Sequence, residues 1–568
     1  MKVSRITTEV YVARKTQLFE FVVFGGLALT IACSSESAGP GPLPSCGAHG
    51  TQLSLAVAQY TSINPSSDSG CVTFAANTSP DSAEYLVLPW STGGTPATST
   101  PFVLQTATPL AATIAPAFLS LRVSQSGSTE GPRGPNAVAF DRFLRESARA
   151  RHYAVPTRSI TGASVPAPSP AGPPTVGSSR TFKVCSNLRC STFDNVGAVA
   201  RAVGTHIAVY VDTLAPSPID SATLNALQQV FDSRLYPLDT ATFGNVSDID
   251  GNSVVIVLMT GTVNHLISKA QCANGYIAGF FFTGDLDPAF ASQFNNGEIF
   301  YSVVPDPNGT LSCAHSNADV EGLTPVIFTH EFQHMINFVE HVLVRSANSE
   351  EGWLDEGLSK YAEELAGRSY LPDSQAAFSR YAFNSVLDAY DYLTATGSSP
   401  LLIPADTGTL AEVGASWLFT RYIVDQFGAA LPGQLVQSSL AGAANVTAKT
   451  GQPFATTVSN WALANWVSDL PGFTAPAELR YTTWHFHTTY ASLHAQDSTD
   501  FARAYPLVPA VRAGSAVNVS GTLWSGSGAY VRVVQKPGDP AFTLHFSGPA
   551  GAPVSAAVLP RLNVLRIR

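Results

Sequence analysis

The sequence predicts an α+β fold in which a mixed sheet and a helical subdomain are flanked by small all-β domains. Over residues 181–300, short apolar segments of strand type alternate with helical segments, as in a sheet covered by helices. Residues 324–470 are mostly helical, whereas both ends of the chain carry short alternating segments between Gly and Pro clusters. At 568 residues, the chain is long enough for several domains, each with its own core.

The first 33 residues have the features of a bacterial export signal. Basic residues near the start precede an apolar run from Phe21 to Ala32, which is too short to cross a bilayer but suits a signal. The run ends in LTIAC, which is similar to a lipobox, so Cys33 is the expected lipidation site and membrane anchor. A Ser/Gly/Pro-rich tether follows at 34–45. We expect an exported lipoprotein of the cell envelope or outer surface, with free secretion as the alternative.

The charge balance excludes a nucleic-acid binder. Charged residues make up only 13% of the chain, the net charge is −10 and the pI is about 5.6. The sequence therefore lacks the basic surface that a phosphate backbone requires. We expect no nucleic-acid partner, and a monomer.

The cysteines fit an oxidising compartment. With Cys33 assigned to the lipid, an even set of six remains, which in an exported protein indicates disulfides. None of them has the CxxC spacing of a zinc cluster, so we expect no thiolate metal site. Pairing by proximity along the sequence predicts the bonds Cys46–Cys71, Cys185–Cys190 and Cys272–Cys313.

Composition and periodicity divide the rest of the chain into four parts. We expect an N-terminal β domain at 46–122 and a Pro/Ser/Ala-rich linker at 123–180, which contains one short helix at 141–153. The main α+β domain is expected at 181–502 and a C-terminal β domain at 503–568.

Each expected element of the main domain follows from its hydrophobic period. A helix-like segment lies at 193–203. Apolar runs of strand character lie at 205–211, 253–259, 276–282 and 298–304. One helix has an apolar stripe formed by Leu224, Leu227, Phe231 and Leu235. Later helices are expected at 324–342, 353–365, 409–427 and 455–467.

The turn SDIDGN at 247–252 has a carboxylate spacing that faintly resembles a calcium loop. It lacks the remaining ligands of such a loop, so a tight turn is the favoured interpretation. Calcium binding has no further support in the sequence.

The segment THEFQHMIN carries the clearest chemical pattern in the chain. Thr324 is the expected N-cap of its helix, with Pro325 at the first helical position. Residues four apart share a helix face, so His330 and His334 can ligate one ion, while Glu331 lies beside them without being a ligand. The apolar flanks indicate a buried helix, in which these polar groups need a partner. Zinc is favoured over the alternative of a helix with structurally satisfied histidines.

A zinc site needs a third protein ligand, and the next segment offers one. A metzincin site is excluded, because Asn337 and Glu340 stand where that motif has Gly and His, and no methionine follows the helix. The segment EEGWLDEGLSKYAEE predicts a helix with Glu356 and Glu363 on one face. Glu356 is the expected ligand, and Glu363, with Asp355 as a further candidate, is expected to orient a histidine. Weaker candidates for the ligand are Glu350, Glu351 and Asp355.

Together the two segments resemble the gluzincins, zinc peptidases whose HExxH motif is completed by a glutamate on a following helix. HEFQHMINF followed by WLDEGLSKYAEE looks most like the hyicolysin family of bacterial extracellular neutral zinc peptidases. The resemblance extends over about 181–470 and includes DIDGN and GASWLFTRYIVDQFG. WLDEG is also similar to WLNEG of zinc aminopeptidases, but Asp355 replaces the Asn, the spacing is longer and no GAMEN-like segment is present.

The resemblance implies a zincin-like metallopeptidase domain that holds one zinc ion per chain and hydrolyses peptide bonds of extracellular proteins as an endopeptidase. Glu331 would be the general base. Gluzincins use a tyrosine or histidine as a second oxyanion donor, which makes Tyr390, Tyr392 and Tyr422 candidates. The strand at 298–304 is expected to border the cleft and to pair with extended substrate. The alternative function is a catalytically silent surface lipoprotein that binds protein or glycan through a zincin-like scaffold and β domains.

Overall fold

The computed structural model describes residues 46, 50–66, 69–107, 134–154, 172–403 and 408–568. The export signal with Cys33, the tether and part of the linker lie outside the described residues. Within the described part of the chain, no helix combines the length and the apolar character that crossing a membrane requires.

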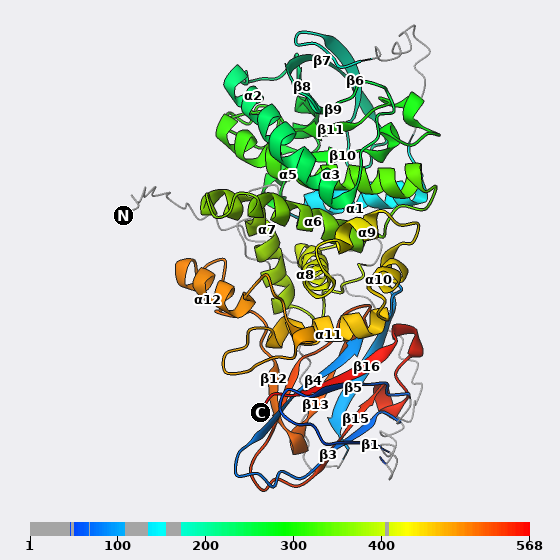
Figure 1. The fold of residues 1–568 in the computed structure, drawn as a ribbon, viewed down its shortest axis with the longest axis vertical. Helices are drawn as coiled ribbons and strands as arrows, with labels where there is room; N and C mark the ends of the chain where they lie inside the picture. Colours follow the sequence, from blue (N-terminus) through cyan, green and yellow to red (C-terminus); the bar gives the residue numbers. More distant parts are fainter. Residues whose placement is uncertain (1–45, 47–49, 67–68, 108–133, 155–171, 404–407) are drawn as a thin grey trace, which may run out of the picture. The chain divides into compact units, whose positions relative to one another are not determined.

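A six-stranded mixed sheet confirms the α+β character of the central region (Figure 1). Its strand order is β10-β11-β9-β8-β7-β6. The strands are β6 (Ser179–Cys185), β7 (Phe193–Val203), β8 (Ile207–Asp212), β9 (Val255–Met259), β10 (Gly279–Phe281) and β11 (Ile299–Ser302). β8, β9 and β11 run parallel, whereas β6, β7 and β8 pair antiparallel, as do β10 and β11. The parallel strands are almost wholly buried, as expected for strands covered on both faces.

Two of the strands differ from the prediction. Residues 193–203, expected to be helical, form β7, in which Val196, Ala198, Ala200 and Ala202 are buried at alternate positions. Alanine favours helices intrinsically, but pairing with β6 and β8 prevails here. The strand at 298–304, expected to border the cleft as an edge strand, is β11 and lies between β9 and β10. The edge strand next to β11 is therefore β10, and β6 lies at the opposite edge of the sheet.

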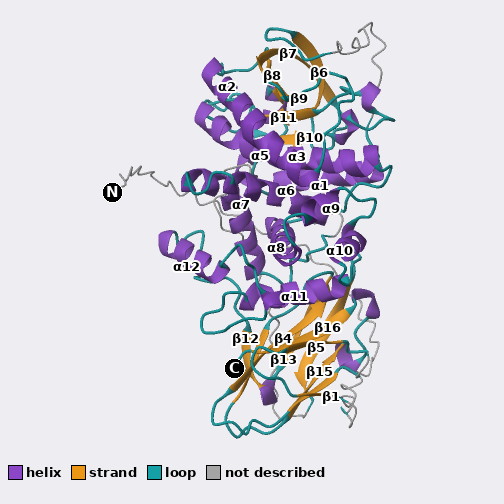
Figure 2. Cartoon of the chain, in the orientation of Figure 1, coloured by secondary structure: helices purple, strands orange, loops and turns teal. Residues whose placement is uncertain are grey.

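Helices cover the sheet and form most of the region that follows it in the chain (Figure 2). α5 (Asn317–Phe338) contacts β10 and β11, and α6 (Gly352–Arg368) contacts α5. α2 (Ser221–Val230) continues through a π-helical turn into α3 (Tyr236–Phe243), which confirms the stripe from Leu224 to Leu235. The other α-helices that follow β6 in the described chain are α4 (Gly261–Asn264), α7 (Gln375–Thr394), α8 (Leu410–Phe427), α9 (Leu431–Val436), α10 (Gly442–Thr450), α11 (Phe454–Val467) and α12 (Phe486–Gln496).

The helix that carries HEFQH begins earlier than predicted. Ser316, and not Thr324, is the N-cap of α5: its hydroxyl accepts a hydrogen bond from Asp319 N, and the Asp319 carboxylate accepts one from Ser316 N. This capping box satisfies two backbone donors at the helix start. Pro325 therefore lies inside the helix, where the Thr324 hydroxyl donates to Val320 O. Burial of α5 against the sheet offsets the backbone bond that the proline removes.

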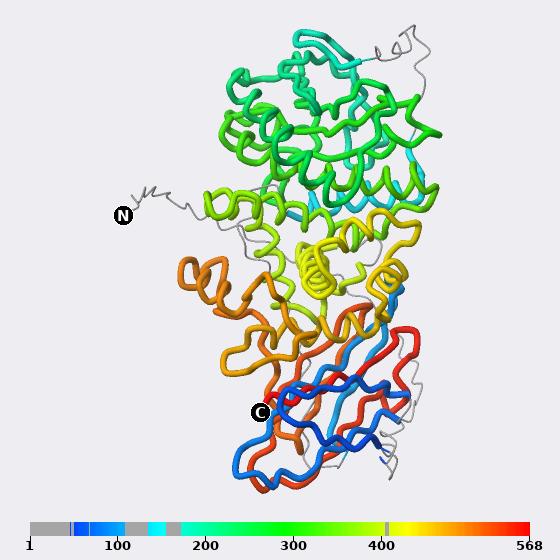
Figure 3. The backbone as a smooth tube through the Cα atoms, viewed as in Figure 1, coloured from blue at the N-terminus to red at the C-terminus, as the bar shows by residue number. Residues whose placement is uncertain are grey.

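Strands from the two ends of the chain form one sandwich instead of two separate β domains (Figure 3). Its sheets have the orders β1-β3-β15-β5-β13 and β12-β14-β4-β16-β2. The strands are β1 (Thr51–Leu53), β2 (Tyr60–Ile63), β3 (Cys71–Phe74), β4 (Ala83–Ser91), β5 (Ser99–Thr106), β12 (Ala510–Ala513), β13 (Asn518–Trp524), β14 (Val531–Gln535), β15 (Phe542–Ser547) and β16 (Pro560–Arg566). Phe74 stacks on Phe542 in the shared core, with ring centroids 4.5 Å apart. Alternation within a segment predicts strands but does not specify their partners.

All three predicted disulfides are present. Cys46–Cys71 joins the start of the described chain to β3, and Cys185–Cys190 closes the connection between β6 and β7. Cys272–Cys313 joins the segment before β10 to the segment before α5.

The helix expected at 141–153 is α1 (Pro135–Ala150), which begins six positions earlier. Pro135 suits the first helical position, where its missing N–H costs no hydrogen bond. Phe140, Leu144 and Ala148 form a buried stripe along one side of the helix. A part of the expected linker is therefore packed against the main domain.

The shared sandwich predicts that residues 46–107 do not fold alone. β4 lies between β14 and β16, and β5 lies between β13 and β15, so the isolated segment loses both neighbours of both strands. We expect an unfolded amide NMR spectrum for this fragment, and a dispersed spectrum when it is joined to residues 508–568 by a Gly/Ser linker. A folded spectrum from the fragment alone would contradict a shared core.

Candidate metal centre

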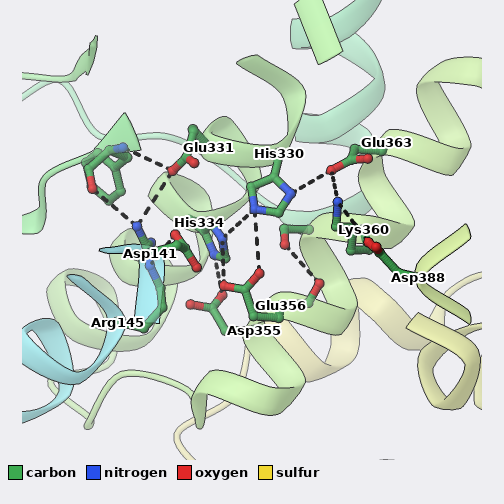
Figure 4. Close-up of polar contacts among 12 residues, drawn as sticks. Asp141, Arg145, His330, Glu331, His334, Asp355, Glu356, Lys360, Glu363 and Asp388 are labelled. Carbon is green, nitrogen blue, oxygen red and sulfur yellow. Dashed lines mark hydrogen bonds and ion pairs between the residues drawn. The ribbon is translucent and has the colours of Figure 1, made fainter. Parts of the chain in front are cut away.

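α5 brings the two histidines of the HEFQH segment together. His330 and His334 lie one turn apart on the buried half of the helix, and their Nε2 atoms are 3.2 Å apart (Figure 4). The exposed fractions of the two residues are 8% and 1%. Two imidazole nitrogens that face each other at this distance, away from bulk water, need a proton or a cation between them.

Glu356 of α6 completes a set of three donors. Its Oε1 lies 3.4 Å from His334 Nε2, and its Oε2 lies 3.7 Å from His330 Nε2. For an ion held tetrahedrally at roughly 2.0–2.1 Å from each donor, neighbouring donors are about 3.4 Å apart. The observed separations of 3.2, 3.4 and 3.7 Å are near this value, with each histidine facing a different oxygen of the Glu356 carboxylate, so the three side chains lie close enough to share one ion.

Carboxylates hold the outer nitrogen of each histidine. His330 Nδ1 lies 2.8 Å from Glu363 Oε1, and Lys360 Nζ lies 3.1 Å from the same oxygen. His334 Nδ1 lies 3.0 Å from Asp355 Oδ1. A histidine that donates its Nδ1–H to a carboxylate keeps the Nε2 lone pair available for an ion. Glu363 and Asp355 are thus placed to orient the two histidines.

The charges around the three donors favour a cation. Burial acts to lower the pKa of His334, but the carboxylates of Asp355 and Glu356 outweigh burial and raise this pKa to about 10. Burial acts to raise the pKa of Glu356, but its contacts with Asp141 and with the histidines hold that pKa well below the usual range. The same arrangement of negative charge would attract a divalent ion.

Glu331 lies beside the donors and outside their set. Its Oε2 accepts a hydrogen bond of 3.0 Å from Phe281 N of β10, and Arg145 Nη2 lies 3.6 Å from the same oxygen. Burial raises the pKa of Glu331, and the positive charges of His330 and Arg145 offset this only in part. A carboxylate with a fixed orientation and a raised pKa is suited to exchange protons.

α1 adds two residues that the sequence pattern did not indicate. The Asp141 carboxylate joins the donors of His330, His334 and Glu356, and the donor atoms of all four residues lie within 4.8 Å of one another. Arg145 follows one helical turn later, with its Nε 3.4 Å from Asp141 Oδ1. The only local signal is an Asp–Arg pair four residues apart beside an apolar stripe, a common pattern on helix surfaces.

A cavity of about 390 Å³ opens onto this group. Residues of α1, β10, α5 and α6 line it, among them His330, Glu331, Glu356 and Lys360. This volume is typical of a binding pocket, and its walls combine charged and polar side chains with apolar ones.

The three candidate tyrosines lie elsewhere in the helical region. Tyr390 accepts a hydrogen bond from a backbone N–H, and Tyr422 donates one of 2.7 Å to a backbone carbonyl. Tyr392 is fully buried and stacks on Trp461, with ring centroids 5.6 Å apart. None of the three is among the described residues that line the cavity. Their surroundings are those of core aromatic residues.

The weaker ligand candidates have other partners. Glu350 accepts hydrogen bonds from Asn445 Nδ2 at 2.8 Å and from Glu351 N at 2.7 Å. Glu351 Oε2 accepts one of 2.8 Å from the indole of Trp353. Asp355 faces the outer nitrogen of His334. Among the described residues, none of these three acids belongs to the set around His330.

A second acidic group contains Asp248, Asp250 and Glu298, whose carboxylate oxygens lie within 4.8 Å of one another. Arg180 Nη1 lies 3.4 Å from Asp250 Oδ2 and supplies a positive charge. Gly251 has a φ of +67°, a conformation that glycine adopts without strain. These contacts are those of a tight turn held by an arginine, as the sequence favoured, and they lead to no calcium assignment.

Comparison with known proteins finds similarity to a metalloprotease, which agrees with a metal-binding site. The chain is similar to the neutral metalloprotease ShpI of Staphylococcus hyicus, with 25% identity over 243 residues. The aligned part covers 42% of this chain and 50% of ShpI, so the chain spans about half the length of this relative. No protein-family model matches the chain. The similarity and the group of His, Asp and Glu donors together support a metallopeptidase.

The donor geometry predicts graded losses of metal affinity. Glu356→Ala should remove a ligand and weaken Zn²⁺ binding most, whereas Glu363→Gln should weaken it by about 10- to 100-fold, because it loosens the hold on His330. Competition with a chromophoric chelator measures both affinities. Glu321→Gln, at an exposed position on α5, is the matched control and should leave the affinity unchanged. A Glu356→Ala protein that binds Zn²⁺ as tightly as the wild type would exclude this ligand set.

Proposed function

We propose that this chain is a zinc-dependent peptidase that hydrolyses peptide bonds of extracellular proteins as an endopeptidase. One observation carries the proposal. Two imidazole nitrogens and one carboxylate converge closely enough to share one ion, and the Glu331 carboxylate lies next to them without joining them. Two histidines and one glutamate form a donor set of catalytic zinc sites, in which a further position stays open.

The residues divide into those that hold the ion and those that orient its ligands. His330, His334 and Glu356 would hold one zinc ion per chain, while Glu363 and Asp355 would orient the two histidines. When bound, zinc lowers the pKa of water toward neutrality and polarises a carbonyl group.

Glu331 would act as the general base and then as the general acid. It would accept a proton from the attacking water and later donate it to the leaving amine. The hydrogen bond from Phe281 N holds the carboxylate toward the cavity, and burial raises its pKa so that it can both take and return a proton. The donor for the oxyanion stays unassigned, because the candidate tyrosines have other contacts.

Edge strand β10 would supply the recognition of substrate backbone. β10 lies at the end of the sheet, contacts α5 and contributes residues to the wall of the cavity. An extended peptide can add to such an edge through main-chain hydrogen bonds, which do not require a chain terminus. This mode of binding favours cleavage within a polypeptide.

The finer assignments belong to the same proposal. The gluzincin arrangement and the likeness to the hyicolysin family draw support from Glu356 on the helix after HEFQH and from the similarity to ShpI. We place the peptidase domain at 181–502. Three disulfides support export to an oxidising compartment, where Cys33 would carry the lipid anchor.

One observation favours the alternative of a silent binding protein. Asp141 would supply a fourth protein donor, and zinc sites with four protein ligands are structural. Glu331 distinguishes the two functions, because a structural site has no use for a buried carboxylate beside its ligands.

Glu331→Gln tests the mechanism. We expect the variant to bind one zinc ion as the wild type does and to lose hydrolysis of fluorescently labelled casein by at least about 10²-fold, because it cannot take up a proton. Zinc content and casein hydrolysis are measured on the same preparation, with Glu321→Gln as the control. Unchanged hydrolysis by Glu331→Gln would exclude this residue as the base.

A further inference from the structure

We propose that Asp141 is a fourth ligand of the bound ion and that α1 thereby keeps the peptidase latent. The inference rests on the proposed function and adds a form of regulation to the same site. It concerns a helix that precedes the sheet in the chain and lies within the expected linker.

Asp141 lies beside the three donors, where a catalytic zinc ion would need an open coordination position for water or substrate. Its carboxylate lies within 4.8 Å of the donor atoms of His330, His334 and Glu356. A catalytic zinc site has three protein ligands, and its fourth position takes water or substrate. A carboxylate from α1 in that position leaves no room for either of them.

Arg145 restricts access to the general base, Glu331, as Asp141 restricts access to the ion. Its Nη2 lies 3.6 Å from Glu331 Oε2 and donates a hydrogen bond of 3.2 Å to Phe281 O. The N–H of Phe281 in turn donates to Glu331. The Arg145 side chain is 5% exposed and contacts both the base and edge strand β10 in the lining of the cavity, where a substrate peptide would enter.

Three arginines of α1 face three glutamates from different segments. Arg142 lies 4.0 Å from Glu412 of α8, Arg145 lies 3.6 Å from Glu331 of α5, and Arg149 lies 3.5 Å from Glu351 at the start of α6. These charges match along one helix, at spacings of three and four residues. The complementarity fixes the position of α1 over the site.

Apolar and polar contacts hold the helix in this place. Phe140 packs edge-on against Phe280 of β10, with ring centroids 5.2 Å apart. After the helix, the Arg151 guanidinium binds both carboxylate oxygens of Asp287, and the Tyr153 hydroxyl is 3.0 Å from Thr283 Oγ1. These contacts hold α1 against β10, so that Asp141 and Arg145 line the cavity beside the donors.

The test uses the full chain loaded with Co²⁺, whose visible spectrum reports its ligands. Asp141→Ala and the near-isosteric Asp141→Asn are compared with Glu321→Gln, an exposed acid on α5 outside the cavity lining. We expect both Asp141 variants to change the Co²⁺ spectrum and to bind acetohydroxamate more tightly than the wild type. We expect Asp141→Ala, loaded with zinc, to hydrolyse casein on the order of tenfold faster or more, since one competing ligand is gone.

Two further variants separate the causes. Phe140→Ala removes a contact of α1 with β10 but keeps Asp141, so it should loosen α1 and raise hydrolysis by less than Asp141→Ala does. Glu331→Gln combined with Asp141→Ala should return hydrolysis to background, which shows that the gained activity belongs to this site.

An unchanged Co²⁺ spectrum in both Asp141 variants would overturn the ligand assignment. A changed spectrum with no gain in hydrolysis over an active wild type would overturn latency. If the spectrum changes but neither the wild type nor any variant cleaves casein, the fourth ligand stands and the proposed peptidase function fails. If all proteins cleave casein alike with one spectrum, the peptidase stands and the inference about α1 fails.

Discussion

The site depends on the close approach of two buried imidazoles to a carboxylate. His330 and His334 direct their Nε2 atoms at each other and at Glu356, at separations of 3.2 to 3.7 Å. Such an arrangement is unfavourable in a protein interior unless positive charge lies between the groups. The surroundings favour such a positive charge, since the carboxylates of Glu363 and Asp355 lie against the Nδ1 atoms of His330 and His334. A cation bound between α5 and α6, as proposed, would therefore stabilise the packing of the two helices.

Edge strand β10 connects the sheet to this centre. One residue of the strand, Phe281, donates its N–H to the Glu331 carboxylate, and its carbonyl accepts a hydrogen bond from Arg145. The strand thus positions the Glu331 carboxylate, the proposed general base, and at the same time borders the cavity. α1 contacts the same strand through Phe140 and brings Asp141 to the donors of His330, His334 and Glu356. Recognition of substrate and closure of the site would compete for one surface.

Local periodicity was sufficient to predict the part of the site that lies on single helices. His330 and His334 share a face because a helix fixes residues four apart, and the same rule placed Glu356 and Glu363 together. Local periodicity could not predict the role of Asp141, because its contact with the donors arises from tertiary packing of a helix far away in sequence. The same limit explains the β segments: alternation located their strands, but the pairing of β4 and β5 with strands from the other end of the chain depends on the whole fold. At 193–203, strand pairing prevailed over the helix preference of alanine.

Zinc K-edge X-ray absorption on the purified full chain, together with its zinc content, tests the central claim most directly. The proposed centre predicts one zinc ion per chain, a first shell of nitrogen and oxygen at roughly 2.0–2.1 Å without sulfur, and outer-shell scattering from two imidazoles. Absence of zinc after reconstitution, or a shell with fewer than two imidazoles, would contradict a metal centre built from His330, His334 and Glu356.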